Sequence, residues 1–314
     1  MQDHPILSAD IGGTHARFLH GVADGGGKPA DFESGDYPDI AALIEAGLKQ
    51  LGLHAQGTDA VLSLAGPVRH GRVTLTNLSW VIDAADLQKR FGFRHVALLN
   101  DLEAAAWALA EDPPEPSLVL RDGVAEPGAR HAVISASTGL GTAYWSRVDG
   151  KLQVQAAEAG HAGFAPSEDW QVDLLRTLLE RYAGRVSWER VLSGSGLSLL
   201  EAHLRGGEAA ASKDVVRRAI SGEATAVTAV KRYSRLLGVF AGDLALAAPA
   251  DGGIWFMGGV LTGLGKLLDR EEFLQGFDAK GRLSPQVAKL PLMVTWSDDL
   301  GIRGAWYAAQ TLFR

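Results

Sequence analysis

The pattern of apolar and polar positions along the chain predicts two similar hairpins. Residues 6–10 form a short apolar run that ends in Asp10, a glycine turn follows, and 16–22 form a returning strand. The same arrangement recurs at 132–148, where an apolar run leads into a glycine-containing turn and a second strand. The repetition predicts two related lobes.

The remaining pattern predicts alternating strands and helices, which is typical of α/β architecture. Strands are expected at 59–68, 72–83, 95–100, 254–257 and 292–296, and helices from residue 101 and at 168–184, 195–206, 222–248 and 299–312. Proline and glycine cluster at 111–128, which predicts the passage between the lobes. We therefore expect a small domain formed by 1–110 with 299–314 and a large domain formed by 111–298.

Length and charge narrow the function classes. At 314 residues the chain exceeds the usual size of a single core, which agrees with two lobes. The formal net charge of -7 argues against a nucleic-acid partner, because such partners normally require clustered Lys and Arg. The chain has no cysteine, which excludes disulfides, thiolate metal sites and a cysteine nucleophile.

The distribution of apolar residues predicts a cytoplasmic protein with no membrane partner. The start of the chain lacks the basic residues and long apolar run of a signal peptide. The apolar stretch at 236–264 is broken by Asp243, Pro249 and Asp251, so it does not suit a membrane span.

The first glycine turn is a candidate phosphate site. Glycines allow backbone N–H groups to approach phosphate oxygens, a threonine hydroxyl can add a hydrogen bond, and an aspartate can hold Mg²⁺ or its waters. The candidates for these roles are Gly12, Gly13, Thr14 and Asp10, with Asp10 as an indirect Mg²⁺ ligand. An ordinary glycine hairpin explains the same residues, so both interpretations stay open.

Two further glycine turns strengthen the nucleotide hypothesis by repetition. Thr138 and Gly139 lie in the second hairpin turn, which could grip the other end of a triphosphate. Gly258 and Gly259 follow the strand at 254–257 and could pass under a nucleotide base, although a plain strand-to-helix turn accounts for them equally well. Neither a P-loop motif nor a G-x-G-x-x-G motif occurs in the sequence.

Asn100 and Asp101 lie where a buried strand meets a helix, a position at which open α/β sheets place ligands. A carboxylate there can accept a proton from an attacking hydroxyl, while the neighbouring amide binds a second hydroxyl. Both residue types are also common helix caps. The local sequence does not decide between these roles.

Three more polar residues suit the recognition of sugar hydroxyls. Glu158 and His161 are three apart and project together if the segment is helical or turned. Glu189 follows an apolar anchor and precedes a serine-glycine turn. Each of them alone fits a structural or solvent-facing role. Glu158 and His161 could be half of a carboxylate metal site, but the sequence has no second copy of that motif, so recognition of a sugar is the better fit.

Taken together, these segments resemble the bacterial glucokinase family, the branch outside the repressor/ORF/kinase group. The similar segments cover essentially the whole chain and are DIGGTHAR (10–17), AGPV (65–68), TNLSW (76–80), LLNDLEAAAWAL (98–109), STGLGTA (137–143), EAGHAGFAP (158–166), ERVLSGSGL (189–197), MGGV (257–260) and DAKGRL (278–283). The resemblance implies an actin-like (ribonuclease H-like) ATPase fold with a cleft between a small and a large domain.

The resemblance also implies an activity: phosphorylation of the 6-hydroxyl of glucose, with Mg-ATP as donor. By position, Asp101 becomes the general base, and Asn100, Glu158, His161 and Glu189 join it as sugar ligands. The phosphate contacts fall on the 10–14 turn and on Thr138 and Gly139. A homodimer is a further expectation from the family.

Two residues depart from the family pattern, and two alternative functions follow. His15 stands where asparagine is usual, and Ser137 stands where glycine is usual, so nucleotide binding is the less secure half of the prediction. One altered hydroxyl contact would direct the enzyme to another hexose or an amino sugar. Loss of phosphoryl transfer would leave a sugar-binding regulatory protein.

Overall fold

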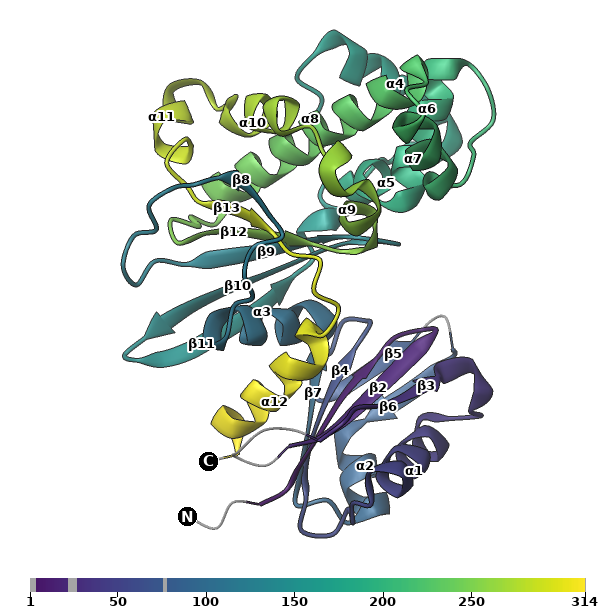
Figure 1. Ribbon diagram of the computed structural model, residues 1–314, viewed down its shortest axis with the longest axis vertical. Coiled ribbons are helices and arrows are strands. Elements are labelled where there is room, and N and C mark those ends of the chain that lie inside the picture. The colour runs from purple at the N-terminus through teal and green to yellow at the C-terminus, as the bar shows by residue number, and fades with distance from the viewer. Residues whose placement is uncertain (1–3, 22–26, 76–77, 314) are drawn as a thin grey trace. The chain divides into compact units, whose positions relative to one another are not determined.

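A computed structural model describes residues 4–21, 27–75 and 78–313 (Figure 1). The chain divides into two compact units. The first consists of Met1–Pro114 and Ser297–Arg314, and the second of Glu115–Trp296. The sequence-based boundaries after residues 110 and 298 lie close to these divisions.

The first unit is built on a five-stranded sheet in the order β3-β2-β1-β4-β7. Its strands are β1 (Ile6–Ile11), β2 (His15–Gly21), β3 (Ala30–Glu33), β4 (Asp59–Leu64) and β7 (His95–Asn100). β1, β2 and β3 form an antiparallel meander, whereas β1, β4 and β7 are parallel. The register pairs Ile11 with Leu64 and Leu64 with Asn100, so the parallel strands end at one edge of the sheet.

The second unit repeats this topology. Its sheet has the order β11-β10-β9-β12-β13-β8, formed by β8 (Leu118–Arg121), β9 (His131–Ala136), β10 (Leu140–Val148), β11 (Lys151–Ala157), β12 (Gly253–Met257) and β13 (Leu292–Val294). β9 pairs antiparallel with β10 and parallel with β12, as β1 does with β2 and β4. The predicted duplication is confirmed, with β8 added at one edge.

Helices of the first unit are α1 (Ile40–Leu51), α2 (Ala84–Phe91), α3 (Asp101–Glu111) and α12 (Leu300–Leu312). α12 comes from the end of the chain and packs beside α3 (Figure 1). The close approach depends on Gly304, where a Cβ would lie 1.6 Å from the carbonyl oxygen of Ala104. Glycine therefore lets the last helix complete the first unit.

Most of the helices belong to the second unit, together with the six-stranded sheet. They are α4 (Asp169–Arg181), α5 (Trp188–Leu192), α6 (Gly194–Arg205), α7 (Ser212–Ile220), α8 (Ala224–Ala247), α9 (Gly259–Leu264), α10 (Arg270–Asp278) and α11 (Ser284–Val287). α8 is the central helix of this core, and its Tyr233 is fully buried. The Tyr233 hydroxyl donates to the carbonyl oxygen of Leu192, 2.6 Å away, which anchors the end of α5.

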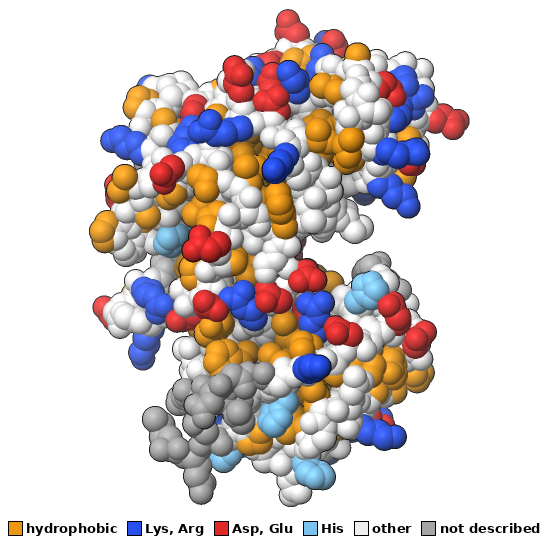
Figure 2. Space-filling model, in the orientation of Figure 1, with side chains coloured by type: hydrophobic (Ala, Val, Ile, Leu, Met, Phe, Trp, Pro, Cys, Tyr) orange, Lys and Arg blue, Asp and Glu red, His pale blue; other side chains and the backbone are white. Residues whose placement is uncertain are grey.

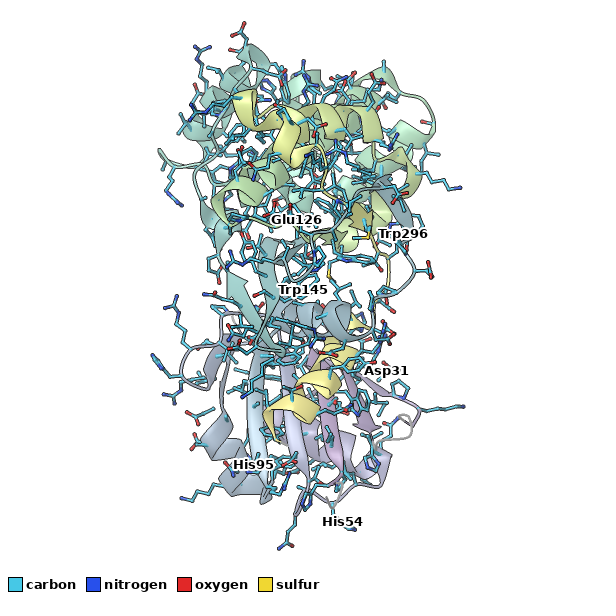
Figure 3. The ribbon with its side chains drawn as sticks, turned by 90° about the vertical axis from the view of Figure 1, so that its left-hand side faces the viewer. Asp31, His54, His95, Glu126, Trp145 and Trp296 are labelled. Carbon is cyan, nitrogen blue, oxygen red and sulfur yellow. The ribbon has the colours of Figure 1, made fainter. Side chains whose placement is uncertain are left out.

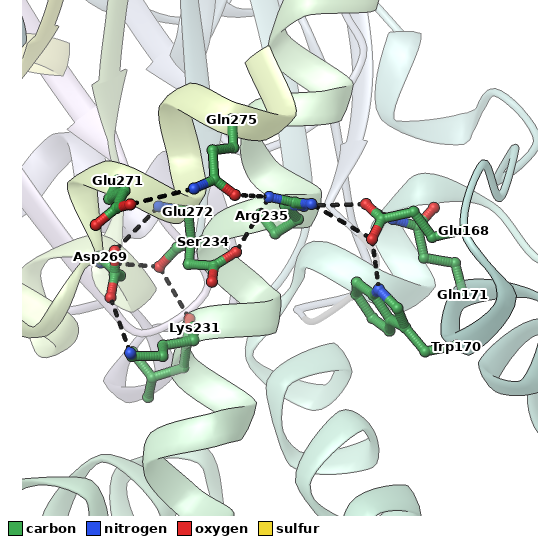
Figure 4. Close-up of polar contacts among 11 residues, drawn as sticks. Glu168, Trp170, Gln171, Lys231, Ser234, Arg235, Asp269, Glu271, Glu272 and Gln275 are labelled. Atoms are coloured by element: carbon green, nitrogen blue, oxygen red, sulfur yellow. Dashed lines mark hydrogen bonds and ion pairs between the residues drawn. The ribbon is translucent and has the colours of Figure 1, made fainter. Parts of the chain in front are cut away.

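A polar network ties α8 to its neighbours α4 and α10 (Figure 4). The Arg235 guanidinium on α8 donates to Glu168, which precedes α4, at 3.0 Å, and to Glu272 on α10 at 3.3 Å. Glu168 also accepts from the indole N–H of Trp170. Arg235 and Trp170 lower the pKa of Glu168 against the opposing effect of burial.

Three sequence-based expectations on secondary structure are wrong in detail. The single strand expected at 72–83 is a hairpin of β5 (Arg72–Leu75) and β6 (Trp80–Asp83), whose turn includes Ser79 at φ 54°. The strand expected at 59–68 ends at Leu64, before a bend at Gly66. The passage at 111–128 contains β8. Thr76 and Asn77 of the family-like TNLSW segment lie outside the described residues.

Charged side chains of both signs are mixed on the visible surface (Figure 2). Within residues 4–21, 27–75 and 78–313, no helix combines the length and apolarity needed to cross a membrane. In the first unit, His95 begins β7 and lies at the opposite end of that strand from Asn100 (Figure 3). His95 and Arg94 pair there with the buried carboxylate of Asp59, far along the strands from the candidate site.

Candidate functional site

The first glycine turn joins β1 to β2 and is hydrogen-bonded to Ser34. The Gly12 N–H donates to the carbonyl oxygen of His15 at 2.9 Å, which closes the turn. The Ser34 hydroxyl donates to the carbonyl oxygen of Gly12 at 2.9 Å, and the Ser34 N–H donates to that of Thr14 at 2.7 Å. Thr14 is exposed. The support lies on one side, so Gly13 and Thr14 face outward as a phosphate site requires.

Asp10 lies at the end of β1, where its carboxylate is enclosed by three neighbours. Ser63 on β4 donates its hydroxyl to Oδ1 at 2.7 Å, and Arg17 is its partner in the β1–β2 register. A Cβ on Gly301 of α12 would lie 2.5 Å from the carboxylate. Burial raises the pKa of Asp10, while the Ser63 hydrogen bond and the Arg17 charge lower it.

A cavity of about 520 Å³ lies beside Asp10 on the same face of the sheet, and charged residues line it. Arg17 donates from Nε to Asp31 at 2.9 Å and from Nη1 to the carbonyl oxygen of Asp298 at 3.2 Å. His15 pairs with Glu33 through an Nδ1–Oε1 contact of 2.9 Å. His15 therefore has a defined partner on β3.

The sequence left two roles open for Asn100 and Asp101, helix cap and general base, and the structure distinguishes the two residues. Asn100 caps α3, because its Oδ1 accepts from the N–H of Leu102 at 2.9 Å, while its Nδ2 donates to the carbonyl oxygen of Gly66 at 3.1 Å. Asp101 is the first residue of the helix, and its carboxylate accepts from the N–H of Leu102 at 2.8 Å, with further hydrogen bonds from its own N–H and the Asn100 side chain. Asn100 thus supplies the cap of α3, and Asp101 shares the Leu102 N–H with it.

The electrostatic setting of Asp101 suits a general base. Burial raises the pKa of Asp101 to about 6, the negative charge of Asp10 adds to this increase, and hydrogen bonds from the start of α3 oppose it. A base with a pKa slightly below neutrality is ionised at pH 7 and still accepts a proton readily. Asp10 lies near the carboxyl end of β1 and Asp101 follows the carboxyl end of β7, with β4 between the two strands.

The second glycine turn joins β9 to β10 in the second unit and has three residues, Ser137 to Gly139. The Ser137 N–H donates to the carbonyl oxygen of Gly139 at 2.9 Å, and the Ser137 carbonyl oxygen accepts from the N–H of Gly194 at 2.9 Å. Ser137 is not among the non-glycine residues with positive φ. Its Cβ is therefore accommodated without backbone strain, and Thr138 remains exposed at the tip.

Gly258 and Gly259 adjoin the second glycine turn. Met257 pairs with Ser135, which places the ends of β12 and β9 side by side. Gly258 has a φ of 107°, and a Cβ there would lie 2.4 Å from the carbonyl oxygen of Ala136, so only glycine fits. Gly259 begins α9 with open space around it. The two glycines thus form a turn between β12 and α9.

Glu158, His161 and Glu189 converge in the second unit. Glu158 precedes a single 3₁₀ turn, Ala159–His161, which brings its Oε2 to 3.7 Å from His161 Nε2. The other ring nitrogen of His161 lies 4.0 Å from Glu189 Oε1. All three side chains are partly or largely open to solvent. Two carboxylates and an imidazole can together accept from and donate to several hydroxyls.

The structure thus gathers the predicted residues into two sets, one in each unit. The first set holds the 10–14 turn with Asn100 and Asp101, and the second holds Thr138, Gly139, Gly258, Gly259 and the Glu158–His161–Glu189 cluster. Sequence reasoning missed the supporting residues Ser34, Ser63, Arg17 and Gly301. Their roles depend on strand register and helix packing, which no local motif encodes.

The Asp10 and Asp101 carboxylates also fit a magnesium ion. Within the described residues, no group of three or more His, Asp or Glu side chains forms a dedicated metal cage. Mg²⁺ commonly uses one or two carboxylates together with waters and substrate phosphates, so such a cage is not needed. Two buried carboxylates whose charges repel provide the negative potential that attracts a divalent cation.

Comparisons with known proteins agree with this geometry over nearly the whole chain. The family model described as Glucokinase matches residues 7–312. A glucokinase of Caulobacter vibrioides is 35% identical over 309 residues, covering 95% of this chain and 93% of that protein.

Solved structures show the same likeness. The crystal structure of glucokinase from an Antarctic psychrotroph is 30% identical, with a TM-score of 0.86 over 98% of this chain and 99% of that one. A ROK family glucokinase from Streptomyces griseus, solved with glucose and AMPPNP, is 20% identical with a TM-score of 0.62 over 96% and 97%, and shows the fold alone. The duplicated sheet is that of the actin-like ATPase fold, and the chain belongs to the glucokinase family.

Proposed function

We propose that this protein transfers the γ-phosphate of ATP to the 6-hydroxyl of glucose, with Asp101 as the general base. The observation that carries the proposal is the state of Asp101: a buried carboxylate at the junction of β7 and α3, beside the capping residue Asn100, with its pKa raised to about 6. Membership of the glucokinase family supports the choice of glucose as the acceptor.

In this mechanism Asp101 accepts the proton of the sugar 6-hydroxyl while the oxygen of that hydroxyl bonds to the γ-phosphorus of ATP. The bond between that phosphorus and the bridging oxygen of ADP breaks, ADP leaves, and Asp101 then returns its proton to solvent. Phosphoryl transfer depends mainly on positioning and charge neutralisation. A single base of matched pKa is therefore the main chemical demand on the side chains.

The sugar contacts are assigned to Asn100, Asp101, Glu158, His161 and Glu189. The Asn100 amide is held by its bond to the Gly66 carbonyl oxygen and also donates to the Asp101 carboxylate, which places it beside the general base. The cluster of Glu158, His161 and Glu189 supplies acceptors and a donor whose spacing suits adjacent hydroxyls. An analogue lacking one of these hydroxyls would leave a polar group unpaired, which gives stereochemical selection.

The nucleotide contacts are assigned to the three glycine turns. Gly12, Gly13 and Thr14 with Thr138 and Gly139 would contact phosphates through backbone N–H groups and hydroxyls, and Gly258 with Gly259 would lie against the base. Asp10 would hold Mg²⁺ through water, and the ion would neutralise charge on the phosphates when bound. Burial of Asp10 beside Asp101 supports this assignment.

A sugar panel tests the proposal directly. ADP release should be measured with glucose, mannose, fructose, galactose and glucosamine, with ATP, ADP and polyphosphate as donors. We expect glucose with ATP to give the highest kcat/KM. Turnover of another sugar without glucose would overturn the choice of substrate, and calorimetric glucose binding without any turnover would overturn the assignment as a kinase.

We also propose that the protein is a cytoplasmic homodimer without nucleic-acid or membrane partners. The net charge of -7 and the mixture of charges on the visible surface support the proposal that the partners include neither nucleic acid nor a membrane (Figure 2). Light scattering coupled to size exclusion would test the dimer, since a mass of one chain at micromolar concentration would contradict it.

A further inference from the structure

The carboxylate of Glu189 faces two features at once. Its Oε1 lies 4.0 Å from the Nδ1 of His161, in the proposed sugar-binding cluster. Its Oε2 accepts from the N–H of Leu140 at 3.2 Å, where the second glycine turn enters β10. One side chain therefore adjoins both the sugar cluster and the nucleotide turn.

The backbone that carries Glu189 is firmly held. Trp188 is buried against Phe164 and Phe240, and its N–H donates to the carbonyl oxygen of Ala162 at 3.0 Å. The Tyr233 hydroxyl donates to the carbonyl oxygen of Leu192 and so fixes the other end of α5. The Glu189 carboxylate consequently has a defined position.

The same segment holds both ends of the glycine turn. Gly194, which begins α6, donates its N–H to the carbonyl oxygen of Ser137, and Glu189 accepts from Leu140 on the other side. Between these two points, a Cβ on Gly139 would lie 2.8 Å from Glu189 Oε2. Gly139 does not have a positive φ, so an added Cβ there would not strain the backbone and would instead displace the Glu189 carboxylate.

We propose that Glu189 is a positioning residue for the nucleotide turn as well as a sugar ligand, and that it couples the two binding sites. The inference rests on the proposed function, because it assigns the turn to nucleotide and the cluster to sugar. Movement of the carboxylate toward a bound sugar changes its bond to Leu140, and placement of the turn by a nucleotide changes the carboxylate in return. Such coupling is reciprocal in binding free energy.

The first test measures nucleotide affinity without sugar. Glu189→Ala removes the acceptor of the Leu140 N–H, whereas Glu189→Gln keeps one oxygen that can accept there and replaces the charged carboxylate with a neutral amide. We expect Glu189→Ala to weaken Mg-AMPPNP binding about fivefold, the effect of losing one hydrogen bond, and Glu189→Gln to stay within about twofold of the wild type. Unchanged affinity in Glu189→Ala would overturn the positioning role, because a residue that touches only sugar cannot alter nucleotide binding.

The second test measures glucose affinity without nucleotide. Gly139→Ala pushes on the Glu189 carboxylate, while Gly259→Ala, in another proposed nucleotide turn, has open space around its Cβ. We expect Gly139→Ala to weaken glucose binding about fivefold or more and Gly259→Ala to leave it within about twofold. Equal glucose affinities in the two variants would overturn the coupling. Matching circular dichroism spectra confirm that each variant is folded.

The two tests separate this inference from the proposed function. If the wild type fails to phosphorylate glucose but Glu189→Ala still weakens nucleotide binding relative to Glu189→Gln, the positioning role stands and the assigned reaction fails. If the wild type phosphorylates glucose and both comparisons show no difference, the reaction stands and the coupling fails. Absence of nucleotide binding by the wild type would overturn both.

Discussion

At the residue scale, the end of β7 shows how two adjacent polar residues take different tasks. Asn100 satisfies the first N–H groups of α3 and is tied to Gly66, so Asp101 is not needed as a cap. Asp101 is instead desolvated and placed where the Asp10 charge opposes its ionisation. The environment therefore produces a carboxyl group with the pKa that proton transfer at neutral pH requires.

The raised pKa of Asp101 predicts the acid limb of the pH profile. A general base acts only when ionised, so kcat/KM should fall about tenfold per pH unit below pH 6 and level off above it. The profile should be measured with saturating Mg-ATP over a range in which the melting temperature shows the protein to be folded. An acid limb near pH 4, the range of an ordinary aspartate, would contradict the assigned environment.

The raised pKa of the Asp101 carboxyl group also predicts that its contribution to stability depends on pH. Between about pH 4 and 6 the folded carboxyl holds more protons than the unfolded one, so its contribution to stability falls as pH rises and is fully unfavourable above pH 6. Asp101→Asn should therefore be more stable than the wild type at about pH 8, by up to about 3 kcal/mol, and equal to it near pH 4. Urea unfolding at both pH values measures this, and a pH-independent difference would exclude the explanation.

At the element scale, glycines in α12 determine how the last helix completes the first unit. Gly304 packs against the backbone of α3, and Gly301 lies over the Asp10 carboxylate. These contacts place the start of α12 beside the proposed magnesium ligand. A segment nearly 300 residues away in sequence thus helps to shape the same site.

Gly304→Ala should destabilise the protein by about 3 kcal/mol or more, because a Cβ would overlap the backbone of Ala104. Gly263→Ala is the matched control, since it also lies in a helix but has no atom within 4 Å of its added Cβ. The control should be neutral or stabilising by up to about 1 kcal/mol. Equal urea midpoints for the two variants would contradict the packing of α12 on α3.

The sequence predicted those elements whose own pattern defines them. The strand at 95–100, the helices near α4, α6, α8 and α12, and the repeated glycine hairpins are confirmed because apolar periodicity and turn residues are local signals. The 72–83 hairpin was missed because its turn uses Ser79 at positive φ, without a glycine to mark it. Ser63 and Arg17 could not be predicted as neighbours of Asp10, because their proximity follows from strand order and register.

At the scale of the whole molecule, one topology occurs twice and each copy presents a glycine hairpin. In each unit, the glycine turn joins a central strand, β1 or β9, to an antiparallel partner, and a parallel strand pairs with the other side of that central strand. The two copies differ in what accompanies the hairpin: Asp101 in the first unit and the Glu158–His161–Glu189 cluster in the second. The duplication supplies similar turns, and the added residues distinguish their chemistry.

Ligand binding should stabilise the folded protein by mass action. At about 100 times its dissociation constant, glucose should add about 2.7 kcal/mol to the free energy of unfolding, with a corresponding rise in melting temperature. A sugar that the site does not accept serves as the control. A melting temperature that is unaffected by glucose at millimolar concentration would contradict the sugar assignment.

Composition gives a further expectation for the intact protein. Because the chain contains no cysteine, activity should be unchanged by N-ethylmaleimide or by oxidants that form disulfides. The assay is ADP release before and after treatment. Loss of activity would point to modification of another residue type within the site.

The central claim is that Asp101 removes the proton of the sugar hydroxyl, and the Asp101→Asn variant tests it most directly. Asparagine keeps the size and the hydrogen bond to Leu102 but cannot accept a proton. We predict that kcat falls by about 100-fold to 10,000-fold while the calorimetric dissociation constant for glucose changes only a few-fold. A variant that retains a near-normal kcat would remove Asp101 from this role.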